Sequence, residues 1–401
     1  MSDARTLVAA FESGELVRPS ADALNIVDLA NCVAELAGVY GSSRSPNVAA
    51  IAKLIGPADH LVFVIVDGMG MNSIRSHGDG AFIAGHVVAE LQTVFPTSTP
   101  VVLTSLATGV WPCAHGIPGW NVYLSEIDVV AEIIRYARRS DEKDLSELGM
   151  RVEDAFPVPS VVAEFDRDTV SYLPKSIAGT PFSNYTSGNT RLEAYEKLED
   201  AVASIASRVS RSATRTMTQL YIPDLDSACH AFGTESPQVH DVLERVDRAL
   251  AQLAAALPPG SRLVATADHG LLDFDAGQRF EIEPSDPLVA YLTCEPWGTA
   301  RAGNFDVQVA KKREFEKAFQ DRFGEFLYLL TAEEAVALEL YGPGPLSPVM
   351  KRRIGTHLAV SKGPWLLEYH DPSTKEDLPK TKVSQHAGLT AEEMLVPLVV
   401  A

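Results

Sequence analysis

The sequence predicts an α/β protein built on a largely parallel, doubly wound sheet. Three apolar runs are each followed by polar residues, and the first of them is almost continuously β-branched without the alternation of a half-exposed strand, which is typical of a central parallel strand covered on both faces. These runs lie at 61–66, 216–222 and 262–265. Amphipathic helical patterns at 191–209 and 237–257 lie between them, so strand and helix alternate. The chain has 401 residues, of which 46% are hydrophobic, so it has enough apolar side chains to bury a large core.

Charge and composition exclude several classes of partner. The 34 Lys and Arg residues against 53 Asp and Glu residues leave a net charge of −19, which repels nucleic-acid polymers and anionic membranes. No apolar stretch reaches the roughly 18 residues that span a bilayer, and the first residues lack the basic region of a secretory signal. The four cysteines form no CxxC pair, so we expect them to be reduced and structural. We therefore expect a cytoplasmic protein in which an anionic substrate is attracted by local positive charge.

The remaining elements follow in order along the chain. Helical periodicity at 4–11 and 26–37 precedes the first strand, which ends at Asp67-Gly68. Two long segments show no regular pattern: we interpret 125–189 as insertions beside the site and 271–356, with its Gly- and Pro-rich loop, as a cap subdomain. Polar residues that follow the carboxyl ends of parallel strands meet in the crevice where α/β proteins bind ligands.

Aspartate and histidine residues gather after the predicted strands. Asp226 and His230 are four residues apart and would share one face of a helix, Asp268 and His269 follow a strand, and His386 lies near the C-terminus. Carboxylate and imidazole are ligands that zinc and manganese bind. The alternative is a purely structural role: Asp226 would cap its helix beside a surface His230, and Asp268 would close a turn. Spacing alone does not decide between metal binding and this structural role.

Thr99 stands where an apolar helical pattern begins. Pro100 suits the first position of a helix, which predicts Thr99 as the N-cap. The alternative is a nucleophile, because a hydroxyl beside a metal ion at a helix N-terminus is activated and the helix dipole favours an anionic ligand there. The local pattern does not separate the two roles.

Five motifs, in this order, resemble those of the type I phosphodiesterase/nucleotide pyrophosphatase family of the alkaline phosphatase superfamily. They are Val-Ile-Val-Asp67-Gly-Met-Gly, Phe-Pro-Thr-Ser-Thr99 continuing to His115-Gly-Ile, Tyr221-Ile-Pro-Asp-Leu-Asp226-Ser-Ala-Cys-His230, Thr-Ala-Asp268-His269-Gly, and the tail that starts at His386. The resemblance implies an alkaline-phosphatase-like three-layer sandwich. It also implies one catalytic domain over 1–401, within which 271–356 is the cap insertion.

The resemblance further implies two divalent metal ions, most simply zinc, with manganese as the alternative. One ion would be held by Asp226, His230 and His386, and the other by Asp67, Asp268, His269 and the Thr99 hydroxyl. Thr99 would form a phospho-threonine intermediate that water then hydrolyses. Asp224 competes with Asp226 as a ligand, but only Asp226 has the four-residue spacing to His230.

Asn121 is a candidate donor to a phosphoryl oxygen. It matches the family's asparagine only with a shift of one residue, because Trp120 occupies the counted position, and a turn residue is the alternative. His115 is interpreted as structural. His357 could lie near the site, because it precedes the tail motif by about thirty residues, or it could be a strand histidine that packs in the cap. Trp120 and Tyr123 are interpreted as pocket walls or core residues.

Departures from the motifs bear on the substrate. Pro100-Val-Val follows the nucleophile where nucleotide-type members have Phe-Pro-Asn, and no arginine lies within the motifs to clamp a phosphate dianion. We expect a metal-dependent hydrolase of phosphodiester or pyrophosphate bonds in a small phosphorylated molecule. The alternatives are a phosphonate hydrolase or a phosphoryl-transferring mutase of the same superfamily, and a non-catalytic binding protein that keeps the fold. Whether the chain forms a homodimer stays open.

Overall fold

The central sheet of the computed structural model has seven strands, in the order β2-β18-β9-β1-β8-β6-β7. The structure describes residues 3–41, 43, 45–78, 80–374 and 382–401. The strands of this sheet are β1 (His60–Val66), β2 (Val87–Gln92), β6 (Asp168–Pro174), β7 (Arg191–Tyr195), β8 (Thr216–Ile222), β9 (Ser261–Thr266) and β18 (Leu395–Val400). Strands β9, β1, β8, β6 and β7 run parallel, whereas β18 is antiparallel to both β9 and β2. The predicted largely parallel sheet is confirmed.

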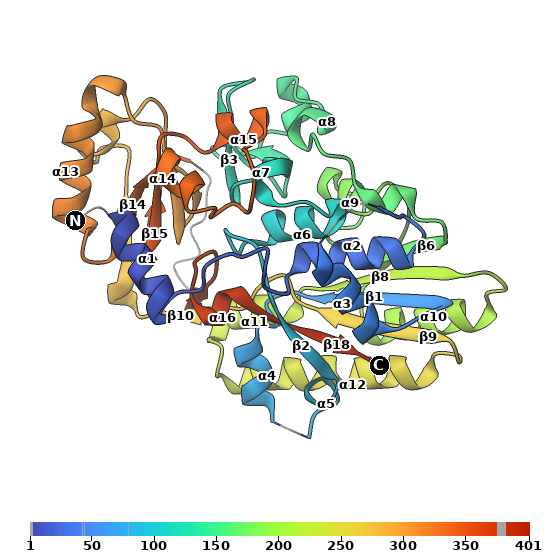
Figure 1. Cartoon of the computed structure of the whole chain (residues 1–401). Helices are drawn as coiled ribbons and strands as arrows, with labels where there is room; N and C mark the ends of the chain where they lie inside the picture. The colour runs from blue at the N-terminus through green and yellow to red at the C-terminus, as the bar shows by residue number, and fades with distance from the viewer. Residues whose placement is uncertain (1–2, 42, 44, 79, 375–381) are drawn as a thin grey trace.

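Helices cover both faces of this sheet and complete a three-layer sandwich. Helices α2 (Ile26–Leu36), α3 (Pro46–Ile55) and α6 (Thr99–Thr108) pack together on one face, and α5 (Phe82–Gly85), α10 (Leu198–Arg211) and α12 (Pro237–Ala256) pack together on the other (Figure 1). Between them, the side chains of β1 are buried along nearly the whole strand. This burial explains the unbroken apolar run that the sequence shows at 61–66.

Two sequence expectations at the edge of this sheet are wrong. The helix expected from Arg191 begins only at Leu198, because 191–195 is the edge strand β7. The segment 125–189, expected to be irregular, contains β6, which pairs with both β7 and β8. Both strands carry charged or hydroxyl side chains among their apolar ones, which masked the strand pattern.

A second seven-stranded sheet joins segments that lie far apart in the sequence. Its order is β14-β15-β13-β12-β3-β4-β5. The strands are β3 (Asn121–Leu124), β4 (Val129–Glu132), β5 (Ala137–Arg138), β12 (Trp297–Thr299), β13 (Ala302–Phe305), β14 (Leu327–Thr331) and β15 (His357–Ser361). Residues 121–138 and 297–361 therefore form one unit, packed beside the sandwich (Figure 1). The cap boundaries of 271–356 stay a prediction.

Further helices and strands complete the described chain. The helices are α1 (Asp3–Ser13), α4 (Met71–His77), α7 (Pro112–His115), α8 (Val152–Ala155), α9 (Pro181–Thr186), α11 (Asp224–Phe232), α13 (Lys312–Phe323), α14 (Ala332–Ala337), α15 (Pro348–Arg353) and α16 (Ala391–Met394). The strands are β10 (Leu272–Asp273), β11 (Arg279–Ile282), β16 (Leu366–Tyr369) and β17 (Ser384–Gln385).

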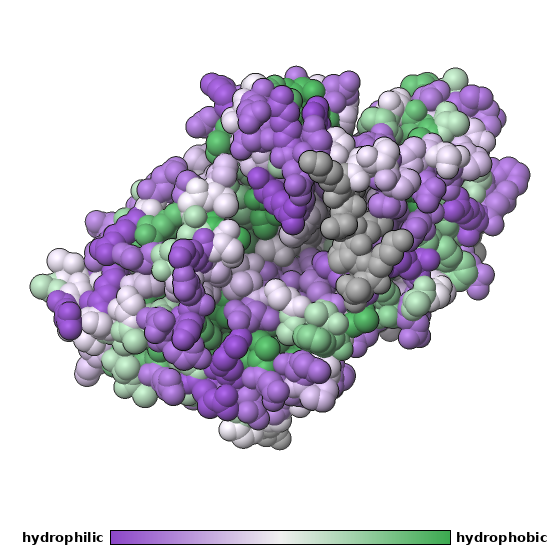
Figure 2. All heavy atoms as spheres, turned by 180° about the vertical axis from the view of Figure 1, so that it is seen from behind, coloured by the Kyte–Doolittle hydropathy of each residue, from purple (hydrophilic) through white to green (hydrophobic). Residues whose placement is uncertain are grey.

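The surface is largely polar. Figure 2 shows hydrophilic side chains over much of one face, with smaller apolar areas between them, as expected of a chain with a net charge of −19. Within the described ranges, no helix combines the length and apolar character needed to cross a membrane. The four cysteines, all of which the structure describes, are unpaired.

Candidate metal centre

Three neighbouring strands deliver most of the candidate ligands to one edge of the central sheet, and His386 reaches it from the turn after β17 (Ser384–Gln385). Asp67 directly follows β1, and Asp268 and His269 follow β9. Strand β8 leads into α11, which carries Asp226 and His230 on one face. Because β9, β1 and β8 are adjacent and parallel, their carboxyl ends place these side chains together.

Asp226, His230 and His386 form the first group of candidate ligands. Each offers one ligand atom, and these atoms lie within 4.8 Å of one another. The Asp226 Oδ1 atom is 3.4 Å from His230 Nε2 and 3.9 Å from His386 Nε2. The Nδ1 atoms of the two histidines contact backbone carbonyls, at 2.8 Å from Ser384 and 2.7 Å from Thr97. Each Nδ1–H therefore donates to a carbonyl, which leaves the Nε2 lone pair directed to the site, as in metal-binding histidines.

Asp67, Asp226 and His269 form the second group, again with ligand atoms within 4.8 Å of one another. His269 Nε2 lies 3.7 Å from Asp67 Oδ1 and 3.2 Å from Asp268 Oδ2. Asp268 is anchored through its other oxygen, which accepts the backbone N–H groups of Gly68 and His269. Asp226 belongs to both groups, so its carboxylate lies between them. The family resemblance implied that Asp226 binds only the ion held by His230 and His386.

The carboxylates of this cluster have unused acceptor atoms. Asp67 Oδ1, Asp226 Oδ1 and Asp268 Oδ2 are buried and have no hydrogen-bond partner in the described part of the chain. Burial raises the pKa of Asp67, and the nearby carboxylates of Asp268 and Asp226 raise it further. Burial also raises the pKa of Asp268. Buried carboxylates at such close range need a compensating cation, so the donor set fits divalent metal ions.

Two histidines of the cluster, His230 and His386, are in the form that binds metal. Burial lowers the pKa of His386 well below its ordinary value, and His269 and His230 lower it further. Burial also lowers the pKa of His230. Both imidazoles are therefore neutral near pH 7, and a neutral imidazole is the ligand form of histidine.

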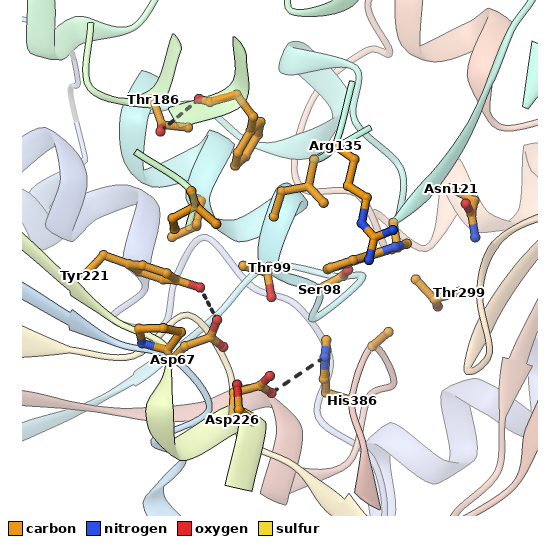
Figure 3. A pocket seen from close by; sticks show the side chains of 18 of the residues that line it. Asp67, Ser98, Thr99, Asn121, Arg135, Thr186, Tyr221, Asp226, Thr299 and His386 are labelled. Carbon is orange, nitrogen blue, oxygen red and sulfur yellow. Dashed lines mark hydrogen bonds and ion pairs between the residues drawn. The ribbon is translucent and has the colours of Figure 1, made fainter. Parts of the chain in front are cut away.

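Thr99 does not cap its helix. Helix α6 begins at Thr99, and Ser98 takes the N-cap position, so the predicted N-cap is wrong by one residue. The Thr99 hydroxyl instead lies 3.3 Å from His269 Nε2 (Figure 3 shows Thr99 facing Asp67 and Asp226). The hydroxyl therefore stands at the helix N-terminus beside both groups of candidate ligands.

Comparison with known families agrees with this arrangement. The model of the family described as type I phosphodiesterase / nucleotide pyrophosphatase matches residues 61–307, which is more than half of the chain. The chain belongs to this family. It is a hydrolase family within the alkaline phosphatase superfamily.

Solved structures share the fold of this family member at low sequence identity. Murine ectonucleotide pyrophosphatase / phosphodiesterase 5 is 18% identical, with a TM-score of 0.62, and the match covers 84% of this chain and 87% of that one. Phosphonoacetate hydrolase from Sinorhizobium meliloti, solved with phosphonoformate, is also 18% identical, with a TM-score of 0.58 over 86% and 89% of the two chains. No curated protein matches the sequence.

Asp224, the competing ligand candidate, belongs to neither group of candidate ligands found among the described residues of this phosphodiesterase-family protein. Its carboxylate pairs with Arg245 at 2.5 Å. The structure thus brings Asp226 to the site and leaves its neighbour two residues away in an ion pair on the helix surface.

Asn121 lies on β3 of the second sheet and lines the same cavity as Thr99. In Figure 3 the two side chains lie apart, with Arg135 between them. The structure therefore places Asn121 at the wall of the cavity, and its role as an oxyanion donor stays a prediction.

Two histidines serve the fold. His115 is buried; its Nδ1 accepts the backbone N–H of Ile117, and its Nε2 lies 3.0 Å from the Ser105 hydroxyl. His357 is buried in β15, where its Nε2 lies 3.3 Å from a Glu316 carboxylate oxygen.

The candidate metal centre opens into a cavity of about 920 Å³, which residues of both sheets line. Trp120, whose indole donates to Glu132 at 3.0 Å, forms part of its wall. Three basic side chains that sequence reasoning missed also line it: Arg135, Arg139 and Lys382. The available signals were a cluster of arginines in an acidic chain and a lysine four residues before His386.

Proposed function

We propose that this protein hydrolyses a phosphodiester or pyrophosphate bond of a small phosphorylated molecule, with Thr99 as the nucleophile. The observation that carries the proposal is the position of the Thr99 hydroxyl, 3.3 Å from His269 Nε2 and at the N-terminus of α6. A side chain that merely capped the helix would bond to the backbone of α6.

Two divalent ions complete the proposed site. Asp226, His230 and His386 would hold one, and Asp67, Asp268 and His269, with the shared Asp226 carboxylate, would hold the other. The mixture of imidazole and carboxylate ligands favours zinc, with manganese as the alternative. Such ions supply positive charge that lowers the pKa of a nearby hydroxyl and stabilises charge on phosphoryl oxygens.

The chain's own residues position the reacting groups. Thr99 Oγ1 gives its proton to solvent and forms a bond to phosphorus, while the bond to the leaving group breaks and that group departs with the electron pair. Water then attacks the phosphorus, which breaks the Oγ1–P bond, releases the phosphorylated product and restores the Thr99 hydroxyl. The N-terminus of α6 favours the negative charge of the bound phosphoryl group. Tyr221 donates a hydrogen bond to Asp67 Oδ2 and so fixes that carboxylate. Asn121 is proposed as a further donor to the phosphoryl group.

The experiment compares wild-type protein with Thr99→Ala and Thr99→Ser, each loaded with Zn²⁺ or Mn²⁺. We expect Thr99→Ala to lose at least about a thousandfold in hydrolysis of bis(4-nitrophenyl) phosphate, and Thr99→Ser to retain part of the activity. Acid quenching of the wild type should give a phosphorylated peptide that contains Thr99. Full metal-dependent activity of Thr99→Ala would refute the nucleophile assignment.

A substrate panel separates the remaining alternatives. It contains aryl diesters, dinucleotides, nucleotide sugars, phosphonates and phosphomonoesters. Preferential phosphonate cleavage would identify a phosphonate hydrolase, and phosphoryl transfer to an added alcohol without phosphate release would identify a transferase. Absence of bound metal, with no rise in Tm on adding it, would favour a non-catalytic binding protein. Cytoplasmic location and homodimer formation stay predictions.

A further inference from the structure

Lys382 enters the cavity beside the metal centre. It lines the cavity together with His386 and Asp226. Its ammonium is within electrostatic reach of the carboxylates of Asp226, Glu368 and Asp67. Across the described ranges, no hydrogen bond or ion pair engages this ammonium. A half-buried ammonium has three donors to satisfy, so an anionic occupant of the cavity would stabilise it.

The other cations of the cavity are already paired. Arg135 lies 3.0 Å from Glu132, and Arg139 lies 2.9 Å from Glu295. Glu368, the acid near Lys382 that lies outside the metal centre, has its own partner in Arg279 at 3.3 Å. Among the described basic side chains that line the cavity, Lys382 is therefore the one available to pair with an anionic group of a ligand.

One end of the cavity, beside α9, is apolar. Leu103 and Leu106 of α6 and Phe182 of α9 line the cavity where α9 packs on α6, and Thr186 of α9 marks this end in Figure 3. Thr99 stands between this apolar end and the side of Asp226 and His386 (Figure 3). A substrate centred on Thr99 would place a neutral or aromatic part at the apolar end and a charged part near Lys382.

We propose that Lys382 is a specificity-determining residue that binds a second anionic group of the substrate, a terminal phosphate, phosphonate or carboxylate, separate from the phosphoryl group that Thr99 attacks. This inference rests on the proposed function and names its substrate class: diesters that carry an additional oxyanion. The lack of arginine within the motifs favoured a diester or phosphonate-type substrate, and Lys382 lies four residues before the tail motif that starts at His386.

The test uses three 4-nitrophenyl phosphodiesters whose second ester arm is ethyl, 2-carboxyethyl or 2-phosphonoethyl. For the wild-type holoenzyme we expect kcat/KM to be about tenfold or more higher for at least one charged arm than for the ethyl arm. A tenfold preference corresponds to about 1.4 kcal/mol, which a single hydrogen bond to a charged group can supply. The carboxylate and phosphonate arms show which oxyanion is preferred. Lys382→Gln should abolish the preference, Lys382→Arg should restore most of it, and the exposed control Lys53→Gln should leave it unchanged.

Binding is measured separately from catalysis. Calorimetric titration of the Thr99→Ala holoenzyme, with and without Lys382→Gln, should show the same preference in Kd, with metal content verified in each sample. If that preference depends on Lys382 while the wild type hydrolyses no diester, the inference stands and the proposed function fails. The inference would be overturned if Lys382→Gln kept the preference for a charged arm, or if it weakened the binding of all three diesters equally. It would also be overturned if a protein with Lys382 intact showed no preference for a charged arm in Kd.

Discussion

A buried ion pair joins the second sheet to the loop that carries His386. Arg301, in the turn between β12 and β13, donates to Glu393 of α16 at 2.6 Å and 2.8 Å. The two side chains are only 1% and 0% exposed. Glu393 also accepts the backbone N–H of Gly388 at 2.7 Å and the Thr390 hydroxyl at 3.0 Å. One carboxylate therefore holds both the second sheet and the turn that follows His386.

We predict that Glu393→Gln strongly destabilises the protein. The change leaves the Arg301 guanidinium buried without a counter-charge, which costs about 3–5 kcal/mol of unfolding free energy. With an unfolding entropy of about 2.1 cal/mol/K per residue, this cost corresponds to a fall in Tm of about 4–6 °C for a chain of 401 residues.

Urea unfolding and calorimetry of Glu393→Gln, Arg301→Met and the double variant measure this effect. The double variant should be less destabilised than the sum of the single variants, because it leaves no unpaired charge. Glu393→Gln should also weaken metal binding, since it loosens the turn beside His386. A loss below about 1 kcal/mol in the single variant, or strict additivity in the cycle, would refute the reasoning.

Three further predictions concern the site and its support. Asp226→Asn should lower metal affinity at least about tenfold, measured by equilibrium dialysis, whereas the matched Asp224→Asn should leave it nearly unchanged; equal losses would contradict the ligand assignment. Gly270→Ala should cost at least about 1–3 kcal/mol in urea unfolding, because its Cβ would clash with the Glu392 carbonyl oxygen; wild-type stability would show that the backbone moves freely there. Burial, and then Arg353, lower the pKa of His115 to about 3 from 6.5, so its contribution to stability is present above pH 6.5 and is lost on acidification towards pH 3, at about 1.4 kcal/mol per pH unit. The unfolding free energy of His115→Gln should fall less steeply over that pH range than that of the wild type. Equal slopes for the two proteins would show that His115 does not cause the acid loss of stability.

The sequence by itself determined the strands that carry the ligands and the order of the motifs. The apolar run at 61–66 coincides with β1, because a strand covered on both faces favours apolar side chains along its whole length. The run at 216–222 coincides with β8, in which Thr216, Thr218 and Gln219 stand among the apolar residues. The four-residue spacing of Asp226 and His230 placed both on one face of α11, because that spacing is close to one helical turn. These are local relations, and a local pattern is sufficient to predict them.

The tertiary structure alone decided how distant segments meet. The second sheet pairs β3 with β12, whose paired residues Asn121 and Gly298 are far apart in the chain, and no periodicity within either segment specifies that pairing. The sharing of Asp226 between two ligand groups likewise depends on side chains from separate elements. Lys382 reaches the cavity only because the tail folds back against the central sheet. Side-chain proximity of this kind depends on packing between elements, which the residues of one segment do not encode.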